Sequence, residues 1–247
     1  MEEWQARTSM LVGEEGVSRL ASSSVMVVGL GGVGSVAAEM ICRAGVGHIT
    51  ILDCDCVSQT NRNRQLPALT STLGRSKCSV VAERLLDINP SLDLRVEEVY
   101  LTGDNVGEAV SSARPDFLVD AIDTLAPKLA LIKYCVDNGI PLVSSMGSGA
   151  KYDITRIRIA DISKSFNCPL AYIVRKKLRK MGIEKGFKVV FSEELPVEGA
   201  IVEMTAAEQA GTANKKSQVG TISYLPVAFG CGCAQAAIQF LLESVLK

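Results

Sequence analysis

Short apolar runs alternate with amphipathic segments along the first 145 residues of the chain. The runs are rich in β-branched residues and predict strands over Val25–Val28, His48–Leu52, Leu94–Tyr100, Phe117–Asp120 and Leu142–Ser145. The intervening segments have helical periodicity and predict helices over Val33–Ala44, Lys77–Ile88, Asn105–Ala113 and Pro127–Asn138. Strands that alternate with helices form crossover units, so we predict an α/β fold with a mostly parallel, Rossmann-like sheet and flanking helices.

The pattern changes after Gly147-Ser148-Gly149. Residues 156–159 alternate polar and apolar side chains and predict a half-exposed strand, Pro169 opens a basic helix, and Val189–Phe191 predicts a further strand. Residues 193–217 are polar, rich in small residues and without periodicity, which indicates a long loop. We expect this last third to extend the same sheet, so that residues 1–247 form one domain with a nucleotide-binding half (1–150) and a substrate and dimer half (151–247).

The segment Val227–Leu246 is apolar and long enough to span a membrane. However, Gln235, Gln239 and Glu243 recur every four residues and form one polar stripe. This pattern favours a buried or dimer-facing C-terminal helix, and we expect no membrane span.

Composition limits the partners and the compartment. The net charge is −1, so any anionic partner must be held by a local basic patch. The acidic start of the chain lacks the basic and apolar regions of a secretory signal. The eight cysteines show no disulfide-framework spacing. We therefore expect reduced thiols in a cytoplasmic protein.

A glycine-rich turn, Gly29-Leu30-Gly31-Gly32-Val33-Gly34, connects the first predicted strand to its helix. Here Gly31 and Gly32 would let backbone amides approach phosphate oxygens at a helix N-terminus. Asp53 follows Gly29 by 24 residues, at a strand end, where an acid can bind ribose hydroxyls. The turn predicts a nucleotide site, for either the dinucleotide of a nicotinamide-dependent oxidoreductase or ATP.

Fixed charges near the turn favour ATP. ATP with Mg²⁺ needs cations for its phosphates and a carboxylate for the metal. Arg64 and Lys77 supply the cations, and Lys77 opens a helix. Asp123 follows an apolar strand and is therefore placed at the carboxyl edge of the sheet, where it is the natural metal ligand. A non-catalytic nucleotide-binding scaffold is the remaining alternative.

These residues together resemble the ubiquitin-activating-enzyme-like superfamily of ThiF and MoeB, which adenylates carboxylates with ATP. The resemblance implies that Asp53 binds ribose and that Asp123 binds Mg²⁺. It implies that Asn61, Arg64 and Lys77 contact the phosphates. It also implies a homodimer in which an N-terminal arginine, here Arg7, reaches the partner's nucleotide. The residues that the resemblance places around ATP are Gly29, Gly31, Gly32, Asp53, Asp55, Asn61, Arg64, Gln65 and Lys77.

Members of that superfamily usually carry two Cys-x-x-Cys zinc pairs, and this chain has none. Cys231 and Cys233 lie two residues apart on a predicted helix, about 200° apart around its axis, so they cannot share an ion. The region that replaces the zinc pairs resembles the tRNA threonylcarbamoyladenosine dehydratase group. The matching segments are 144–147, 160–164, 175–180 and 190–193.

This second resemblance implies ATP-dependent cyclisation of a modified adenosine beside a tRNA anticodon, and it leaves room for a sulfur-transfer protein as a partner. The alternative is an activating enzyme that adenylates the C-terminus of a ubiquitin-like or sulfur-carrier protein. Between Arg175 and Lys188 the chain has seven basic residues and one acid, a local asymmetry suited to phosphate contacts. The residues expected to contact tRNA are Arg175, Lys176, Lys177, Arg179 and Lys180.

Overall fold

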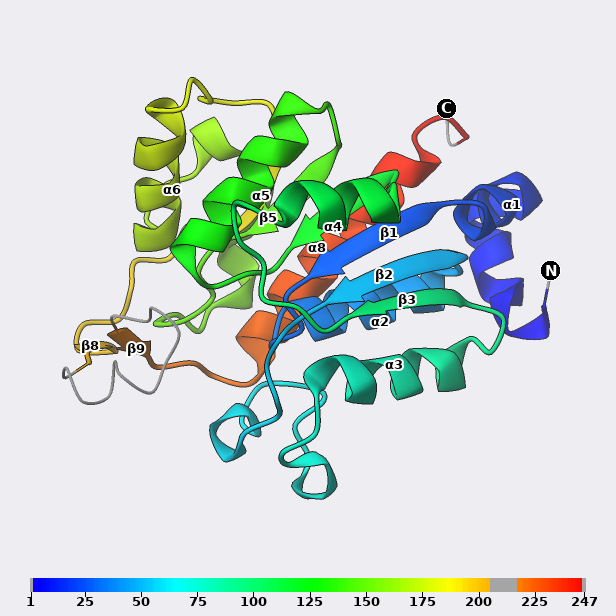
Figure 1. Cartoon of the computed structure of the whole chain (residues 1–247), viewed down its shortest axis with the longest axis horizontal. Helices are drawn as coiled ribbons and strands as arrows, with labels where there is room; N and C mark the ends of the chain where they lie inside the picture. Colours follow the sequence, from blue (N-terminus) through cyan, green and yellow to red (C-terminus); the bar gives the residue numbers. More distant parts are fainter. Residues whose placement is uncertain (1, 205–216, 246–247) are drawn as a thin grey trace.

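The computed structural model describes residues 2–204 and 217–245 and is built on one seven-stranded sheet (Figure 1). Its strand order is β3-β2-β1-β4-β5-β7-β6, and only the edge strand β6 runs antiparallel to its neighbour. The strands are β1 (Ser24–Val28), β2 (His48–Leu52), β3 (Asp93–Glu97), β4 (Phe117–Asp120), β5 (Leu142–Ser145), β6 (Ile157–Asp161) and β7 (Lys188–Ser192). The predicted α/β class is confirmed, and β6 and β7 extend the sheet as expected.

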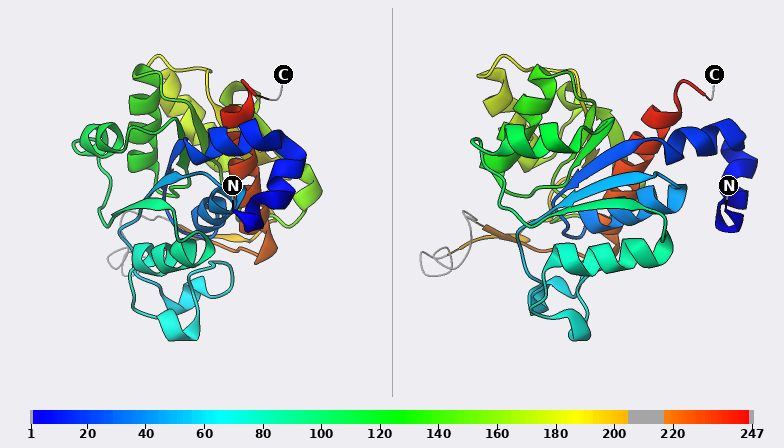
Figure 2. Two further views of the ribbon diagram at one scale, coloured as in Figure 1. Left: turned by 90° about the vertical axis from the view of Figure 1, so that its right-hand side faces the viewer. Right: turned by 45° about the vertical axis from the view of Figure 1, so that its right-hand side comes forward.

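Helices cover both faces of the sheet (Figures 1 and 2). One face packs on α2 (Gly34–Ala44), α3 (Lys77–Ile88) and α8 (Tyr224–Leu242). The other face packs on α4 (Val106–Ala113), α5 (Leu125–Asp137) and α6 (Pro169–Arg179). The N-terminal α1 (Ala6–Ala21) packs near the C-terminal end of α8. Short 3₁₀ turns occur at Glu3–Gln5, Gln59–Asn61, Thr70–Thr72, Ile154–Arg156 and Ile162–Lys164.

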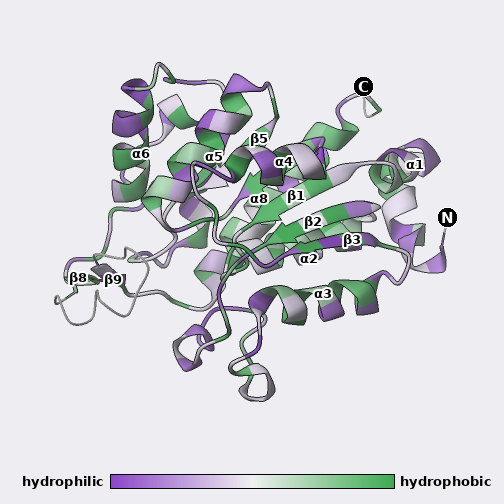
Figure 3. Ribbon diagram, in the orientation of Figure 1, coloured by the Kyte–Doolittle hydropathy of each residue, from purple (hydrophilic) through white to green (hydrophobic). Residues whose placement is uncertain are grey.

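Alternate residues of each central strand enter different cores. Val25 and Val27 of β1 pack toward α2 and α8, whereas Met26 and Val28 pack toward α4 and α5. Because both faces are covered, these strands are mostly apolar, and they form the hydrophobic centre of Figure 3. The continuous apolar runs in the sequence therefore reflect a doubly covered parallel sheet.

The helix α8 is long and apolar enough to cross a membrane by length and composition, but 61% of that window is buried inside the molecule. It packs along α2 and against β4, β5, β6 and β7. Gln235 and Gln239 are on its exposed side. The prediction of a buried C-terminal helix is confirmed.

Several predicted boundaries were wrong. The strand β3 ends at Glu97 rather than Tyr100, and α5 begins at Leu125, two residues before Pro127. A proline is tolerated there because the first turn of a helix has no partner for its N–H groups. The predicted loop over 193–217 contains part of a two-stranded ribbon, in which β8 (Ile201–Glu203) pairs with β9 (Ser217–Val219). Residues 205–216 of that loop lie outside the described residues.

Candidate active site

The glycine turn links β1 to α2 at the carboxyl edge of the sheet. Gly29 has φ of +89°, and a Cβ there would lie 2.9 Å from the carbonyl oxygen of Ala121. A Cβ on Gly34 would lie 1.7 Å from the carbonyl oxygen of Gly29. Both positions therefore require glycine, since the turn closes against itself and against the loop after β4. A side chain on Gly32 would likewise collide with Pro226 of α8.

Asp53 follows β2 and holds the turn by its carboxylate. One oxygen accepts the N–H of Leu30 at 2.5 Å, and the other accepts the N–H of Asp55 at 2.7 Å. Burial raises the pKa of Asp53, and the nearby Lys77 ammonium and the two backbone N–H groups oppose this effect only in part. The predicted ribose-binding acid thus lies directly beneath the glycine turn, as a Rossmann-like nucleotide site requires.

Lys77 is the first residue of α3 and points back to the same acids. Lys77 is only 5% exposed, and its Nζ donates to Oδ2 of Asp55 at 2.7 Å. Its backbone N–H donates to the carbonyl oxygen of Asp55 at 3.0 Å. The chain therefore places a buried ammonium beside both Asp55 and Asp53, at the start of a second helix.

The loop that carries Asn61, Arg64 and Gln65 lies over the glycine turn. Nη1 of Arg64 donates to the carbonyl oxygen of Thr60 at 3.0 Å and to Oδ1 of Asn63 at 2.8 Å. The Oδ1 of Asn61 caps the local 3₁₀ turn through the N–H of Ser58. Among the described residues, Oε1 of Gln65 is the one buried side-chain oxygen or nitrogen with no hydrogen-bond partner, and its amide lies beside Gly31. A buried acceptor next to open glycine backbone fits a nucleotide ligand.

Asp123 lies on the loop that follows β4, the strand beside β1. Its side chain is exposed, and residues 121 and 122 of the same loop touch Gly29. The loop is fixed from below by Asp120, whose Oδ1 accepts the N–H of Ile122 at 3.0 Å. Asp123 is therefore at the edge of the sheet where the sequence placed it, next to the glycine turn.

Arg7 lies far from this group within its own chain. Gln5, two residues earlier, packs against Gly45, which ends α2. The glycine turn precedes the other end of this 11-residue helix, about 16 Å away. Gly16 of α1 approaches Leu242 at the end of α8, whereas Pro226 near the start of α8 touches the turn. Arg7 is thus separated from its own nucleotide site by the length of α2.

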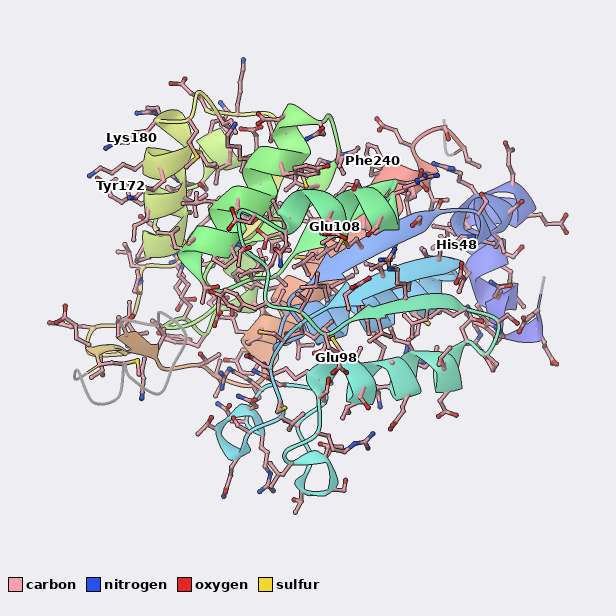
Figure 4. The ribbon with its side chains drawn as sticks, in the orientation of Figure 1. His48, Glu98, Glu108, Tyr172, Lys180 and Phe240 are labelled. Carbon is pink, nitrogen blue, oxygen red and sulfur yellow. The ribbon has the colours of Figure 1, made fainter. Side chains whose placement is uncertain are left out.

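The basic residues of α6 and of its C-cap, Lys180, differ in whether they have a protein partner. Lys176, Lys177 and Lys180 are exposed, and Lys180 projects outward together with Tyr172, which is 59% exposed (Figure 4). Arg175 is half-buried and donates to the carbonyl oxygen of Ser165 at 2.5 Å, whereas Arg179 is exposed and pairs with Glu184 at 3.4 Å. The three lysines are therefore the charges most available to a phosphate backbone.

The model of the ThiF family matches residues 5–246 of the chain. The chain belongs to the ThiF family. The tRNA threonylcarbamoyladenosine dehydratase of Bacillus subtilis (strain 168) is 45% identical over 192 residues, which cover 78% of this chain and 75% of that protein. The protein of the same name from Escherichia coli (strain K12) is 37% identical over 259 residues, covering 99% and 96%.

A crystal structure of the E. coli tRNA N6-threonylcarbamoyladenosine dehydratase, TcdA, in complex with ATP superimposes with a TM-score of 0.87. It is 35% identical and covers 99% of this chain and 97% of that one. The resemblance recognised from the glycine turn and the charged residues is confirmed, and the likeness includes the C-terminal half.

The cysteines of this ThiF-family chain offer no paired zinc site. All eight are free, and among the described residues the one grouping of three candidate metal ligands is Asp53, Cys54 and Asp55, at the acids already described. Burial raises the pKa of Cys42 to about 11 and that of Cys78, Cys135 and Cys233 to about 12. These four thiols stay protonated at neutral pH and are packing residues.

Sequence reasoning missed a buried network under the site. Lys128 and Asp120 are both inaccessible to solvent and form an ion pair of 2.7 Å. Ser144 of β5 donates to the same carboxylate oxygen at 2.6 Å. The sequence contained a signal for this pair, because Lys128 shares a helical face with the buried Leu131, Ile132 and Cys135. A lysine on an apolar helix face must find a buried partner.

Proposed function

We propose that the chain is an ATP-dependent tRNA dehydratase that cyclises N6-threonylcarbamoyladenosine beside the anticodon. One observation carries this proposal: the chain is similar over nearly its whole length to TcdA, which has been crystallised with ATP. The cluster of Asp53, Lys77 and Arg64 around a glycine turn supports the same conclusion, since adenylation needs cations near the phosphates that a hydride-transfer site does not. We take the chain as a single adenylating domain.

In the first step, an oxygen of the threonine carboxylate attacks the α-phosphorus of ATP. The bond between this phosphorus and the bridging oxygen breaks, and pyrophosphate leaves. Negative charge accumulates on the phosphate oxygens, and the cationic groups of Arg64 and Lys77 stabilise it. The N–H groups of the glycine turn and the N-terminus of α2 hold the phosphates, while Asp53 accepts hydrogen bonds from the ribose. Asp55, Asn61 and Gln65 complete the pocket.

In the second step, the carbamoyl nitrogen attacks the carbonyl carbon of the acyl-adenylate. A carbon–nitrogen bond closes the ring, the carbon–oxygen bond to AMP breaks, and the nitrogen loses a proton. The carboxylate oxygen leaves with AMP, so the base loses the elements of water. Because the nucleophile belongs to the same molecule, proximity supplies much of the acceleration. No protein thiol is needed, consistent with four buried, protonated cysteines.

A divalent metal fits the acidic edge of this pocket. Carboxylate oxygens are the ligands that Mg²⁺ prefers, and Asp123 presents one beside the glycine turn. We propose that Asp123 holds Mg²⁺, which would neutralise charge on the β- and γ-phosphates when bound. The residues of the chain bind and orient the remaining groups.

We propose that the active form is a homodimer in which Arg7 serves the partner's nucleotide site. The position of Arg7 supports this arrangement, because the length of α2 separates it from the glycine turn of its own chain. Met10 and Leu11 of α1 are 87% and 83% exposed, which gives the same helix an apolar surface for a second copy.

We further propose that tRNA docks on α6 through Lys176, Lys177 and Lys180, with Arg175 and Arg179 contributing less because they already have protein partners. Phosphate contacts of this kind position RNA without reading its sequence. A cytoplasmic location agrees with a tRNA substrate. A sulfur-transfer protein stays a predicted partner.

The deciding experiment is incubation with ATP and tRNA that carries threonylcarbamoyladenosine, followed by mass spectrometry of the nucleosides under conditions that avoid hydrolysis. We expect a nucleoside lighter by one water and a stoichiometric release of AMP and pyrophosphate. If the nucleoside is unchanged while a ubiquitin-like or sulfur-carrier protein becomes adenylated at its C-terminus, the chain is an activating enzyme and the proposal is wrong.

A further inference from the structure

The buried pair of Asp120 and Lys128 is bound to the backbone that precedes Asp123. Nζ of Lys128 donates to Oδ2 of Asp120 at 2.7 Å and to the carbonyl oxygen of Ile122 at 3.0 Å. Oδ1 of Asp120 accepts the N–H of Ile122 at 3.0 Å. Both polar backbone groups of Ile122 are therefore held by the two charged side chains, one residue before Asp123.

The same segment supports the glycine turn. A Cβ on Gly29 would lie 3.2 Å from the backbone nitrogen of Ile122, and one on Gly34 would lie 3.0 Å from Cβ of Ala121. The loop after β4 and the phosphate-binding turn are thus in direct contact. Any shift of Ala121 or Ile122 would move both the turn and Asp123.

Burying an ion pair between α5 and β4 costs desolvation free energy that apolar side chains would not cost. Removing two charges from water costs several kcal/mol per ion after relaxation, and well-packed apolar side chains of similar volume often stabilise a core equally well. Both residues here are inaccessible to solvent, and α5 could bury an apolar residue at position 128 as it does at 131, 132 and 135. What an apolar residue could not do is donate to the carbonyl oxygen of Ile122.

We propose that Lys128 is a positioning residue for adenylation, which acts through Asp120 and Ile122 to fix Asp123 and the glycine turn in their working geometry. Ser144 of β5, the next strand of the sheet, also holds Asp120 by donating a hydrogen bond to its carboxylate. The proposal rests on the proposed adenylation site, in which Asp123 holds the metal of the ATP complex.

The test compares the wild type with Lys128→Met and with the double variant Asp120→Asn/Lys128→Met. The double variant leaves no buried unpaired charge, so it separates positioning from destabilisation. Calorimetric titration with ATP, with and without Mg²⁺, reports the factor by which the metal tightens ATP binding. Hydrogen exchange of the peptide spanning 120–126 reports the order of the loop. The matched control is Lys133→Met, an exposed lysine on the same helix that pairs with Asp137.

We expect the double variant to keep its metal-free ATP affinity within about threefold, to lose about tenfold or more of the enhancement by Mg²⁺, and to exchange faster over 120–126. Its kcat for pyrophosphate release should fall by about 10²-fold, the size expected for a misplaced reacting geometry. Unchanged metal enhancement and unchanged exchange would overturn the proposal, whatever the melting temperature.

If the double variant does not fold, Ser144→Ala gives a milder test, because it removes one donor to Asp120 and keeps the ion pair. It should reduce the metal enhancement in the same direction, by about threefold, and an unchanged value would count against the proposal. ATP binding and exchange need no RNA. A wild type that binds ATP with metal enhancement but leaves tRNA unmodified would therefore refute the proposed function and not the role of Lys128.

Discussion

Lys77 and Asp55 are joined by a 2.7 Å ion pair, although they lie 22 residues apart: Asp55 is in the loop after β2, and Lys77 is the first residue of α3. The ammonium is nearly buried, whereas the carboxylate is largely exposed. The pair therefore orients the lysine side chain toward the acids at the glycine turn. Because Asp55 stays in contact with water, it restrains Lys77 only weakly.

Replacing Lys77 with Met should remove the ammonium and keep most of the buried side-chain volume. We expect kcat for adenylation to fall by about 10²-fold or more, since a cation aimed at developing phosphate charge is lost. The melting temperature should fall, because the buried Asp53 carboxylate loses a nearby cation, whereas the exposed Asp55 can be hydrated. Single-turnover release of pyrophosphate measures the effect. Arg75→Met is the control, since Arg75 pairs with Glu83 instead; an equal loss of rate in both variants would contradict a specific role for Lys77.

Asp123→Asn keeps the size of the side chain and removes its charge. We expect ATP-dependent turnover to be abolished and the metal no longer to tighten ATP binding, because a neutral amide is a poor ligand for Mg²⁺. Circular dichroism should show an unchanged fold. Asp137→Asn on the exposed surface of α5 serves as the control. Turnover at the wild-type rate in Asp123→Asn would remove Asp123 from the metal role.

The assignment of Arg7 to the partner's site predicts complementation between inactive variants. Arg7→Ala and Lys77→Met homodimers should each be inactive. After mixing and subunit exchange, a heterodimer holds one site with both Lys77 and an intact Arg7 from the partner, so activity should return. Native mass spectrometry would verify the exchange. If activity stays absent although heterodimers form, Arg7 does not act across the dimer.

Replacing Lys176, Lys177 and Lys180 with Ala should weaken tRNA binding and reduce its dependence on salt. Each lost phosphate contact lowers the magnitude of the slope of log K against log salt by about 0.7 to 0.9. The magnitude of this slope should therefore be smaller by about 2 to 3 in the triple variant. Filter binding at several salt concentrations measures this slope, and ATP affinity should not change. The control removes three basic residues elsewhere, Arg43, Arg95 and Lys133. Equal slopes in both triple variants would exclude α6 as the docking surface.

The pKa of Asp53 gives the unfolding free energy a pH dependence of known sign. Burial raises this pKa in the folded state, so the folded protein binds the proton more tightly than the unfolded chain does. The stability contributed by this group is present below the ordinary aspartate pKa of about 3.9 and is lost as pH rises through the folded value. Asp53→Asn should therefore gain stability relative to the wild type as pH increases.

Urea denaturation at about pH 3.5, 5 and 7 tests this sign, since the pH range spans the ordinary aspartate value of about 3.9. The same variant should bind ATP less tightly at pH 7, because an amide is a weaker acceptor for the ribose hydroxyls. A difference in unfolding free energy that does not depend on pH, or that falls as pH rises, would contradict the raised pKa.

The parallel sheet and its crossover helices were predictable because both faces of each central strand are apolar and every helix has one buried face. The glycine turn and Asp53 were predictable for a different reason: their spacing is set by the lengths of α2 and β2, which the periodicity reveals. Lys77 was predictable because it opens the next helical pattern. The confirmed family membership follows from this local pattern. The roles of the individual residues stay predictions.

Other features depend on contacts between distant segments and have no local signature. The ribbon of β8 and β9 pairs residues on either side of a polar stretch, and neither strand has a buried face. The strand β3 ends early because its pairing partner β2 ends at Leu52, which pairs with Glu97. Lys128 could have been noticed on its apolar face, but its partner Asp120 belongs to a strand and is identified only by the fold.

The position of α8 has a consequence for how the protein is made. This helix follows every strand of the sheet in the sequence, yet it covers one face of four strands and touches the glycine turn through Pro226. A nascent chain that still lacks α8 exposes the apolar face of β4 and β5 and has no complete nucleotide pocket. Folding of the active site must therefore wait until α8 has been synthesised, and until then the apolar face of β4 and β5 needs protection against aggregation.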